Sequence, residues 1–245
     1  MVAFGSRSLG DLRRRPLNMM GDVFFKSEWM ETSTDPLFAP TVFLAEQPPC
    51  CELLPHFHRQ NQFQLFVQGS GTIGKEQINP VTVHYAGAYT GYGPILSGAQ
   101  GLKYFTIRAA FDTGLTLATD WRGTMVRGPK CHAQASVGEP WPLERLSMLK
   151  ATQHDITIAP SEGLGVELSR LPPHATVTLP PIQDSVGQFI FVLAGSARLM
   201  SVSMAPWESA FVPYSDGPAL VTAGEYGAQI IALHMPHTAP EYLPR

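Results

Sequence analysis

An internal repeat constrains the fold of this chain more than any other feature of its sequence. Gln62-Phe63 recurs as Gln188-Phe189, and Gly69-Ser70 recurs as Gly195-Ser196, so both pairs are 126 residues apart (188 − 62 and 195 − 69). Three glycine pairs keep the same offset: Gly91 and Gly217, Gly98 and Gly224, and Gly101 and Gly227. One ungapped offset that carries turn residues and apolar residues together indicates two copies of one structural unit.

Short apolar or alternating runs make up both copies, and Gly and Pro, 22 residues each, separate them. The runs are rich in Val, Ile, Phe and Tyr, which favour β-strands. The predicted strands cover residues 62–67, 81–85, 104–111, 165–171, 189–193, 209–212 and 229–234. Residues 143–150 are the best helical candidate, and the glycines of segment 69–74 indicate a hairpin turn. The sequence therefore predicts an all-β protein.

The repeat also predicts the domain boundaries. Residues 1–120 hold the first copy with an N-terminal extension, residues 121–150 form a linker with several Gly and Pro residues, and residues 151–245 hold the second copy. Each copy supplies enough short strands for a small closed barrel or jelly roll, and closure removes exposed strand edges. We expect two such barrels in tandem.

Charge and hydropathy disfavour several classes of protein. Lys and Arg number 17 and Asp and Glu number 20, which gives a net charge of −3, whereas nucleic-acid binders are expected to be basic. No run of about 18 apolar residues predicts a membrane span, and no apolar segment follows the N-terminal arginines as a secretory signal requires. The 3 cysteines lack zinc-binding spacing, so we expect reduced thiols. These features predict a cytoplasmic protein that binds neither nucleic acid nor membranes.

His56 and His58 stand two residues apart, just before the predicted strand at 62–67. Residues two apart on a strand share a face, so both imidazoles point the same way, which in a small barrel can be inward. Gln62 and Gln64 share a face of the next strand and we expect both to line the interior. Two imidazoles on one inner face are half of a metal site. The alternative is a polar pair satisfied by neighbouring groups or water.

The spacing of these residues resembles the first motif of the cupin superfamily. It runs His56-x-His58, three residues, Gln62, six residues and Gly69, with Gln where cupins usually have Glu. The second cupin motif is degenerate in both copies. Its skeleton is best seen in the second copy, at Trp207, Pro213, Ser215 and Pro218. The resemblance implies a bicupin with two jelly-roll (double-stranded β-helix) barrels.

The resemblance also implies a ligand set in the first copy. Pro218 stands at the position of the motif's His, and its counterpart in the first copy is Tyr92 (218 − 126). His56, His58 and Gln62 would then bind a divalent transition metal such as Fe, Mn, Ni or Zn. Tyr92 would be a weak fourth donor or a general acid or base, with Gln64 beside it as a second catalytic candidate. Gln lacks the charge of a carboxylate, and a free Tyr has a pKa of about 10, so binding would be weaker than in a full cupin set.

The second copy and the other histidines give weaker indications of a functional site. In the second copy the counterparts of His56 and His58 at the same offset are Ile182 and Asp184, so we expect no metal and a structural role there. His84 is either an additional inward ligand or a wall residue of its strand. His234 is expected at the surface.

Three functions remain open. The first is a metal-dependent enzyme, dioxygenase-like or isomerase- or lyase-like, in the first barrel. The second is a metal-independent module that binds a small molecule, and the third is a structural protein. Cupin barrels often pair through their edges, so the resemblance also implies a homodimer.

Overall fold

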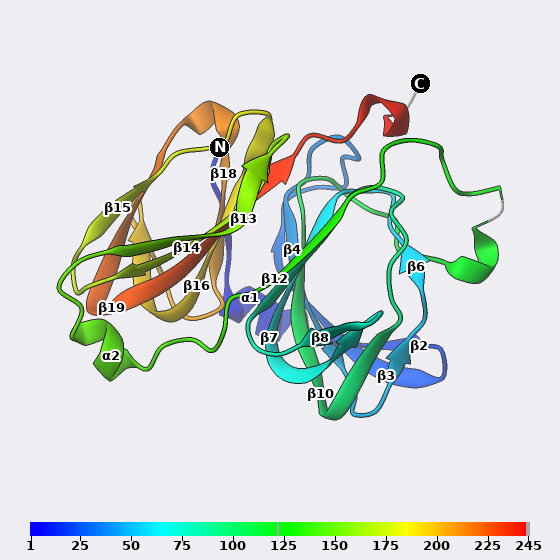
Figure 1. The fold of residues 1–245 in the computed structure, drawn as a ribbon, viewed down its shortest axis with the longest axis horizontal. Coiled ribbons are helices and arrows are strands. Elements are labelled where there is room, and N and C mark those ends of the chain that lie inside the picture. Colours follow the sequence, from blue (N-terminus) through cyan, green and yellow to red (C-terminus); the bar gives the residue numbers. More distant parts are fainter. Residues whose placement is uncertain (122, 244–245) are drawn as a thin grey trace. The chain divides into compact units, whose positions relative to one another are not determined.

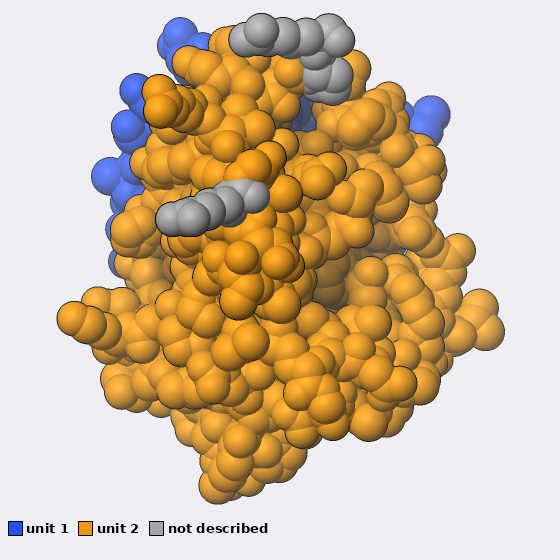
Figure 2. Space-filling model, turned by 90° about the vertical axis from the view of Figure 1, so that its right-hand side faces the viewer, with its two compact units in different colours: residues 1–7, 139–237 blue, residues 8–138, 238–245 orange. Residues whose placement is uncertain are grey.

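The computed structural model describes residues 1–121 and 123–243 (Figure 1). The chain divides into two compact units, coloured in Figure 2. Unit 1 comprises Met1–Arg7 and Glu139–His237, and unit 2 comprises Ser8–Gly138 and Thr238–Arg245. Strands dominate both units, which confirms the prediction of an all-β protein. No helix in the described ranges is both long and apolar enough to cross a membrane.

Unit 2 contains a sheet of nine described strands with the order β12-β9-β7-β10-β4-β3-β2, in which β8 pairs with β7 and β5 with β10. Its strands are β2 (Arg15–Met19), β3 (Asp22–Glu31), β4 (Thr41–Gln47), β5 (Glu52–Leu53), β7 (Gln62–Ile73), β8 (Glu76–Ile78), β9 (Thr82–Ala86), β10 (Ile95–Arg108) and β12 (His132–Ser136). The short strands β6 (His56–Phe57) and β11 (Thr116–Leu117) pair separately. A helix, α1 (Arg7–Leu12), precedes β2.

Unit 1 contains a sheet of eight described strands with the order β1-β18-β16-β19-β14-β13, in which β17 pairs with β16 and β15 with β19. Its strands are β1 (Ala3–Gly5), β13 (Gln153–Ser161), β14 (Leu164–Leu171), β15 (Thr176–Leu179), β16 (Ser185–Leu199), β17 (Val202–Met204), β18 (Ser209–Pro213) and β19 (Ala219–Pro236). The helix α2 (Leu143–Ser147) lies within the segment predicted to be helical.

The two sheets follow the same plan. The order β9-β7-β10-β4-β3 in unit 2 matches β18-β16-β19-β14-β13 in unit 1. Thr106 pairs with Gln64 in one sheet, and Ala232 pairs with Ile190 in the other. Each residue of the second pair stands 126 positions after its counterpart in the first pair (232 − 106 and 190 − 64). The register of the central strands therefore agrees with the repeat in the sequence.

The offset changes in the strands that precede the central pair. Leu53 pairs with Ile95 in unit 2, whereas Val177 pairs with Val221 in unit 1. The offset is therefore 124 in β5 and β15 (177 − 53) but 126 in β10 and β19 (221 − 95). A single offset of 126 does not extend back to the strands before Gln62, because the two copies differ by two residues in the connection.

Of the glycine segment 69–74, which was predicted to be a hairpin turn, only Gly74 lies in the turn, between β7 and β8. Gly69 lies inside β7 with φ at +84°, and a Cβ on it would stand 2.0 Å from the carbonyl oxygen of Gly101. Gly195 repeats this arrangement in β16, with φ at +73° and 2.2 Å to the carbonyl oxygen of Gly227. Only glycine tolerates this close backbone approach. Residues 69–73 are an irregular part of a long strand, and the chain turns only after Ile73.

The predicted barrels are not closed. Within the described residues, neither sheet returns to pair its first strand with its last. Residues 132–136, within the segment predicted as a linker, form β12 at one edge of the sheet in unit 2. In unit 1, β1 takes the matching place beside β18.

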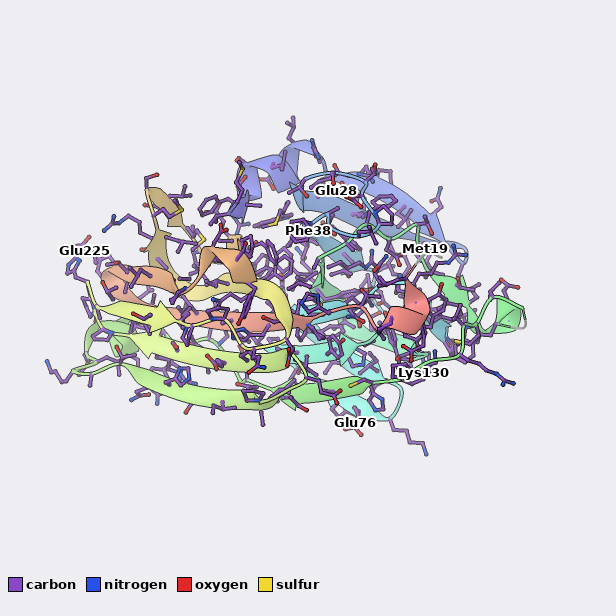
Figure 3. All side chains as sticks on the ribbon, turned by 90° about the horizontal axis from the view of Figure 1, so that it is seen from above. Met19, Glu28, Phe38, Glu76, Lys130 and Glu225 are labelled. Carbon is purple, nitrogen blue, oxygen red and sulfur yellow. The ribbon has the colours of Figure 1, made fainter. Side chains whose placement is uncertain are left out.

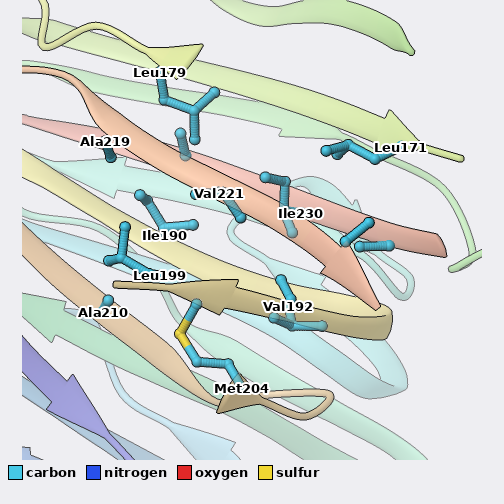
Figure 4. Close-up of a cluster of buried hydrophobic side chains, with 14 of the residues drawn as sticks. Leu171, Leu179, Ile190, Val192, Leu199, Met204, Ala210, Ala219, Val221 and Ile230 are labelled. Carbon is cyan, nitrogen blue, oxygen red and sulfur yellow. The ribbon is translucent and has the colours of Figure 1, made fainter. Parts of the chain in front are cut away.

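The interior of unit 1 holds a cluster of buried apolar side chains, as Figure 4 shows for Ile190, Val192 and Ile230. His234, expected at the surface, is completely buried in this unit. The expectation was wrong because His234 lies near the end of β19, where that central strand pairs with both β14 and β16.

Candidate functional site

A pocket of about 530 Å³ opens in unit 2, lined by residues of β2, β3, β4, β10 and the loop after β10. His56, His58 and Gln64 line it, together with Thr106 and Arg108 of β10. The rest of its wall is largely apolar, including Leu17, Met19, Phe24, Leu53, Tyr104 and Leu115. Met19 and Glu28, labelled in Figure 3, belong to the hairpin of β2 and β3 that forms part of this wall.

A chain of hydrogen bonds connects three of the predicted site residues. Backbone bonds in both directions join His56 and Tyr92, at 3.1 and 3.0 Å. Gln62 Nε2 donates to Tyr92 Oη, and Tyr92 Oη lies 2.9 Å from His56 Nε2. His56 Nδ1 lies 2.7 Å from the carbonyl oxygen of Leu54, which only accepts. The proton of His56 therefore sits on Nδ1, and Tyr92 donates its hydroxyl proton to Nε2.

Arg108 occupies the other side of Gln62. Its Nε and Nη2 donate to Gln62 Oε1 at 3.0 and 2.8 Å, and Nη2 lies 3.0 Å from His58 Nδ1. The side chain is only 6% exposed, and an arginine keeps its charge under such conditions. The positive charge beside the predicted ligands Gln62 and His58 is therefore the guanidinium of Arg108.

Asp112 is the counter-charge of Arg108. Its Oδ1 lies 3.8 Å from Arg108 Nη1 and 3.1 Å from His58 Nδ1, and its side chain is fully buried. The backbone amides of Arg59 and Gly114 donate to its two oxygens at 3.0 and 2.8 Å. Burial opposes its ionisation, but His58 and Arg108 outweigh burial and hold the pKa of Asp112 below its ordinary value. Asp112 is therefore an anion.

The imidazoles of the site are neutral. Burial, and then the charge of His58, lowers the pKa of His56 to about 3. Burial, and then the charge of Arg108, lowers the pKa of His58 to about 4. Burial also raises the pKa of Tyr92 above its ordinary value, so this hydroxyl keeps its proton. The site at neutral pH holds one fixed cation and one fixed anion.

Gln64 and His84 form a second polar pair next to the first. Gln64 Oε1 lies 3.1 Å from His84 Nδ1, and the His84 ring lies 5.0 Å from the Tyr92 ring. Burial lowers the pKa of His84 to about 3. His84 is a buried wall residue and is not among the residues that line the pocket, whereas Gln64 reaches the pocket.

The residues of this site do not fit a divalent metal ion. A metal would need lone pairs of His56 Nε2 and Gln62 Oε1, but Tyr92 and Arg108 donate hydrogen bonds to them. A protonated Tyr92 adds no anionic ligand, and the positive charge of Arg108 repels a cation. Within the described ranges, no group of three His, Cys, Asp or Glu side chains is arranged to hold a metal.

Arg108 and Asp112 were not predicted from the sequence. Arg108 lies in the apolar run predicted as the strand 104–111, and a charged residue in such a run is the signal for a functional interior position. Asp112 lies just beyond that run, and only the fold brings it to His58.

The matching positions of unit 1 carry different chemistry. Offsets of 126 relate Gln64, Tyr104 and Thr106 to Ile190, Ile230 and Ala232, all of which belong to the apolar core of unit 1. The counterpart of Arg108 is His234 (108 + 126). Polar side chains thus surround a pocket in unit 2 where unit 1 has a filled core.

No protein-family model matches the sequence, and no curated protein matches it. Solved structures of similar fold include a candidate dioxygenase from Nostoc punctiforme (12% identity, TM-score 0.58, 100% of this chain and 84% of that chain). The pirin YhhW of Escherichia coli in complex with nickel(II) is another (10% identity, TM-score 0.56, 96% of this chain and 99% of that chain). A third is oxalate decarboxylase of Lactobacillus farciminis in a formate complex (10% identity, TM-score 0.63, 96% of this chain and 86% of that chain). These neighbours are cupin-fold proteins, and at this identity the likeness concerns the fold alone. The chain therefore has the cupin fold.

Proposed function

We propose that this protein is a bicupin whose unit 2 binds a small organic molecule without a metal ion. The proposal assigns one cupin barrel to residues 1–120 and a degenerate one to residues 151–245, with residues 121–150 as the linker. The shared strand order of the two sheets supports two cupin copies, with β12 from the linker added to the sheet of unit 2 and β1 added to the sheet of unit 1. A cytoplasmic homodimer, proposed from the sequence alone, completes the proposal.

The observation that carries the proposal is the position of Arg108. Its guanidinium donates to Gln62 Oε1 and lies 3.0 Å from His58 Nδ1, and the cupin resemblance assigns both of these residues to a metal. A fixed organic cation thus occupies the Gln62 oxygen that a metal would otherwise bind. The pocket volume of about 530 Å³ is typical of small-molecule sites, which span about 300–1,000 Å³.

A second candidate function is a metal-dependent enzyme. His56 and His58 both line the pocket, and burial keeps both neutral, which is the form that binds a metal. The nickel(II) named for the pirin and the dioxygenase assignment of the Nostoc protein also favour this candidate. Arg108 would have to leave its present partners for such a site to form.

Elemental analysis distinguishes the two functions. The protein is purified without a chelator or His-tag, and Fe, Mn, Ni and Zn per chain are measured before and after incubation with each metal. We expect far less than one metal per chain, and no difference between the native protein and a His56→Ala/His58→Ala variant. Near-stoichiometric metal that the double variant loses would overturn the proposal in favour of the metalloenzyme.

A variant of Arg108 provides the positive control. Arg108→Met removes the charge and releases Gln62 Oε1. We expect this variant to bind Ni²⁺ at least 10-fold more tightly than the native protein does, as measured by titration calorimetry. An unchanged Ni²⁺ affinity would show that Arg108 does not exclude the metal.

A further inference from the structure

We propose that the ligand of the pocket in unit 2 is an organic carboxylate with an apolar body, bound through Arg108. The inference rests on the proposed function, because it assigns a chemical class to the molecule in that pocket. The inference follows from one N–H group of Arg108 that has no hydrogen-bond partner in the protein, and from the apolar side chains that line much of the pocket.

Arg108 offers this donor. Its Nε and Nη2 both donate to Gln62 Oε1, but Nη1 has no hydrogen bond to any part of the chain that the structure describes. Asp112 Oδ1 lies 3.8 Å from Nη1, and this distance is too long for a hydrogen bond. Arg108 is 94% buried (100 − 6) and lines the pocket. An unused N–H group of its guanidinium at this position requires a hydrogen-bond acceptor from the ligand.

The other cations of the pocket wall are already paired. Arg15 Nη2 donates to Glu28 at 2.6 Å, and Lys26 Nζ lies 3.1 Å from the same carboxylate. These two side chains therefore add little as anchors for an anion. Arg108 differs because its counter-ion, Asp112, accepts hydrogen bonds from two backbone amides and does not reach Nη1.

Neutral donors lie beside Arg108 on the same wall. Thr106, two residues earlier in β10, shares its face of the strand and lines the pocket with a hydroxyl. Gln64 pairs with Thr106 in the sheet and uses its Oε1 toward His84, which leaves its amide nitrogen as a donor. A carboxylate has two oxygens and accepts from several donors at once, whereas a neutral amide has one acceptor oxygen.

The remainder of the wall selects an apolar body. Apolar side chains that line the cavity include Leu17 and Met19 of β2, Phe24 of β3, Leu53 and Leu115. Removing apolar ligand surface from water against such side chains is favourable. The pocket thus combines one anchored anionic end with an apolar enclosure.

The test uses acids and their matched neutral amides as probes. Phenylacetate and hexanoate, with phenylacetamide and hexanamide, are titrated calorimetrically into the full-length protein at pH 7 with EDTA present. We expect at least one acid to bind at least 10-fold more tightly than its amide. Arg108→Gln should remove this preference, and Arg14→Gln should leave it unchanged. Arg14 is the matched control because it does not line this pocket and pairs with Glu46 at 2.6 Å.

The outcomes separate the inference from the function on which it rests. If an acid and its amide bind equally, or neutral molecules alone shift the melting temperature, the carboxylate class is wrong while metal-free binding stands. If the acids bind only after a metal replaces EDTA, both proposals are wrong. Should Arg108→Gln fail to fold, Arg108→Lys provides the test: it keeps the charge but loses the planar guanidinium, so a reduced preference supports the inference and an unchanged one contradicts it.

Discussion

At the scale of single residues, the site depends on Arg108 and on the groups that keep it charged in the interior. Gln62 Oε1 accepts two hydrogen bonds from it, and Asp112 supplies the opposite charge at 3.8 Å. A buried cation of this kind is stable only while its surroundings compensate for the lost water. Arg108 and Asp112 therefore act as a pair, and removal of either one leaves the other charge buried without its counter-ion.

A double-mutant cycle tests this coupling. We expect Arg108→Met alone to lower the free energy of unfolding by about 3 kcal/mol or more, because Asp112 stays buried without its counter-charge. The double variant Arg108→Met/Asp112→Asn should recover about 1–3 kcal/mol relative to the sum of the single variants. Urea unfolding of the four proteins provides the measurement, and strictly additive effects would contradict the coupling.

At the scale of elements, the hairpin of β2 and β3 contributes one wall of the pocket, and ion pairs hold its two strands together. Glu28 of β3 accepts from Arg15 of β2, and Lys26 of β3 reaches the same carboxylate. Burial raises the pKa of Glu28, but the hydrogen bond from Arg15 and the charge of Lys26 outweigh burial, so the net pKa is lowered. The hairpin is therefore expected to be sensitive to acid.

The pH dependence follows from the direction of this pKa change. An unfolded Glu has a pKa of 4.5 and the folded Glu28 a lower one, so its contribution to stability is complete above that value and is lost as the pH falls through the folded pKa. We expect Glu28→Gln to cost about 1 kcal/mol at neutral pH and progressively less in acid.

Chemical unfolding of both proteins across a series of pH values checks this prediction. Arg15→Gln serves as the matched variant, since it removes the donor and should reduce the same pH dependence. A stability difference between native protein and Glu28→Gln that stays constant through the acid range would contradict the assignment.

At the scale of the whole molecule, two copies of one strand plan carry different interiors. Thr106 and Gln64 pair in one sheet as Ala232 and Ile190 pair in the other. In unit 1 this position belongs to a filled apolar core, and in unit 2 it borders a cavity. We therefore propose that one copy serves packing and the other serves binding.

An exchange of matching residues tests this division. Ile190→Gln places an amide in a fully buried apolar core, so we expect a loss of about 3 kcal/mol or more in the free energy of unfolding. Gln64→Ile should cost about 1 kcal/mol, because the cavity accommodates the new side chain and only the bond to His84 is lost. Equal losses in the two variants, measured by urea unfolding, would contradict the different roles of the two interiors.

The sequence by itself determined the all-β class and the repeat, and the register of the central strands agrees with that repeat. Alternation is a local pattern that backbone geometry converts directly into strands, whereas the repeat is visible because the two copies keep the same residues at one offset. The spacing of His56 and His58 likewise identified two residues that line the pocket.

Only the tertiary structure decided which cation neighbours these residues. Arg108 lies 46 positions from Gln62, and Asp112 lies 54 positions from His58, so no local pattern relates them. The same holds for the open sheets and for the buried His234, because strand pairing across the chain sets both. Which charge sits beside which lone pair depends on contacts distant in sequence, and here those contacts place a guanidinium where the motif alone predicted a metal.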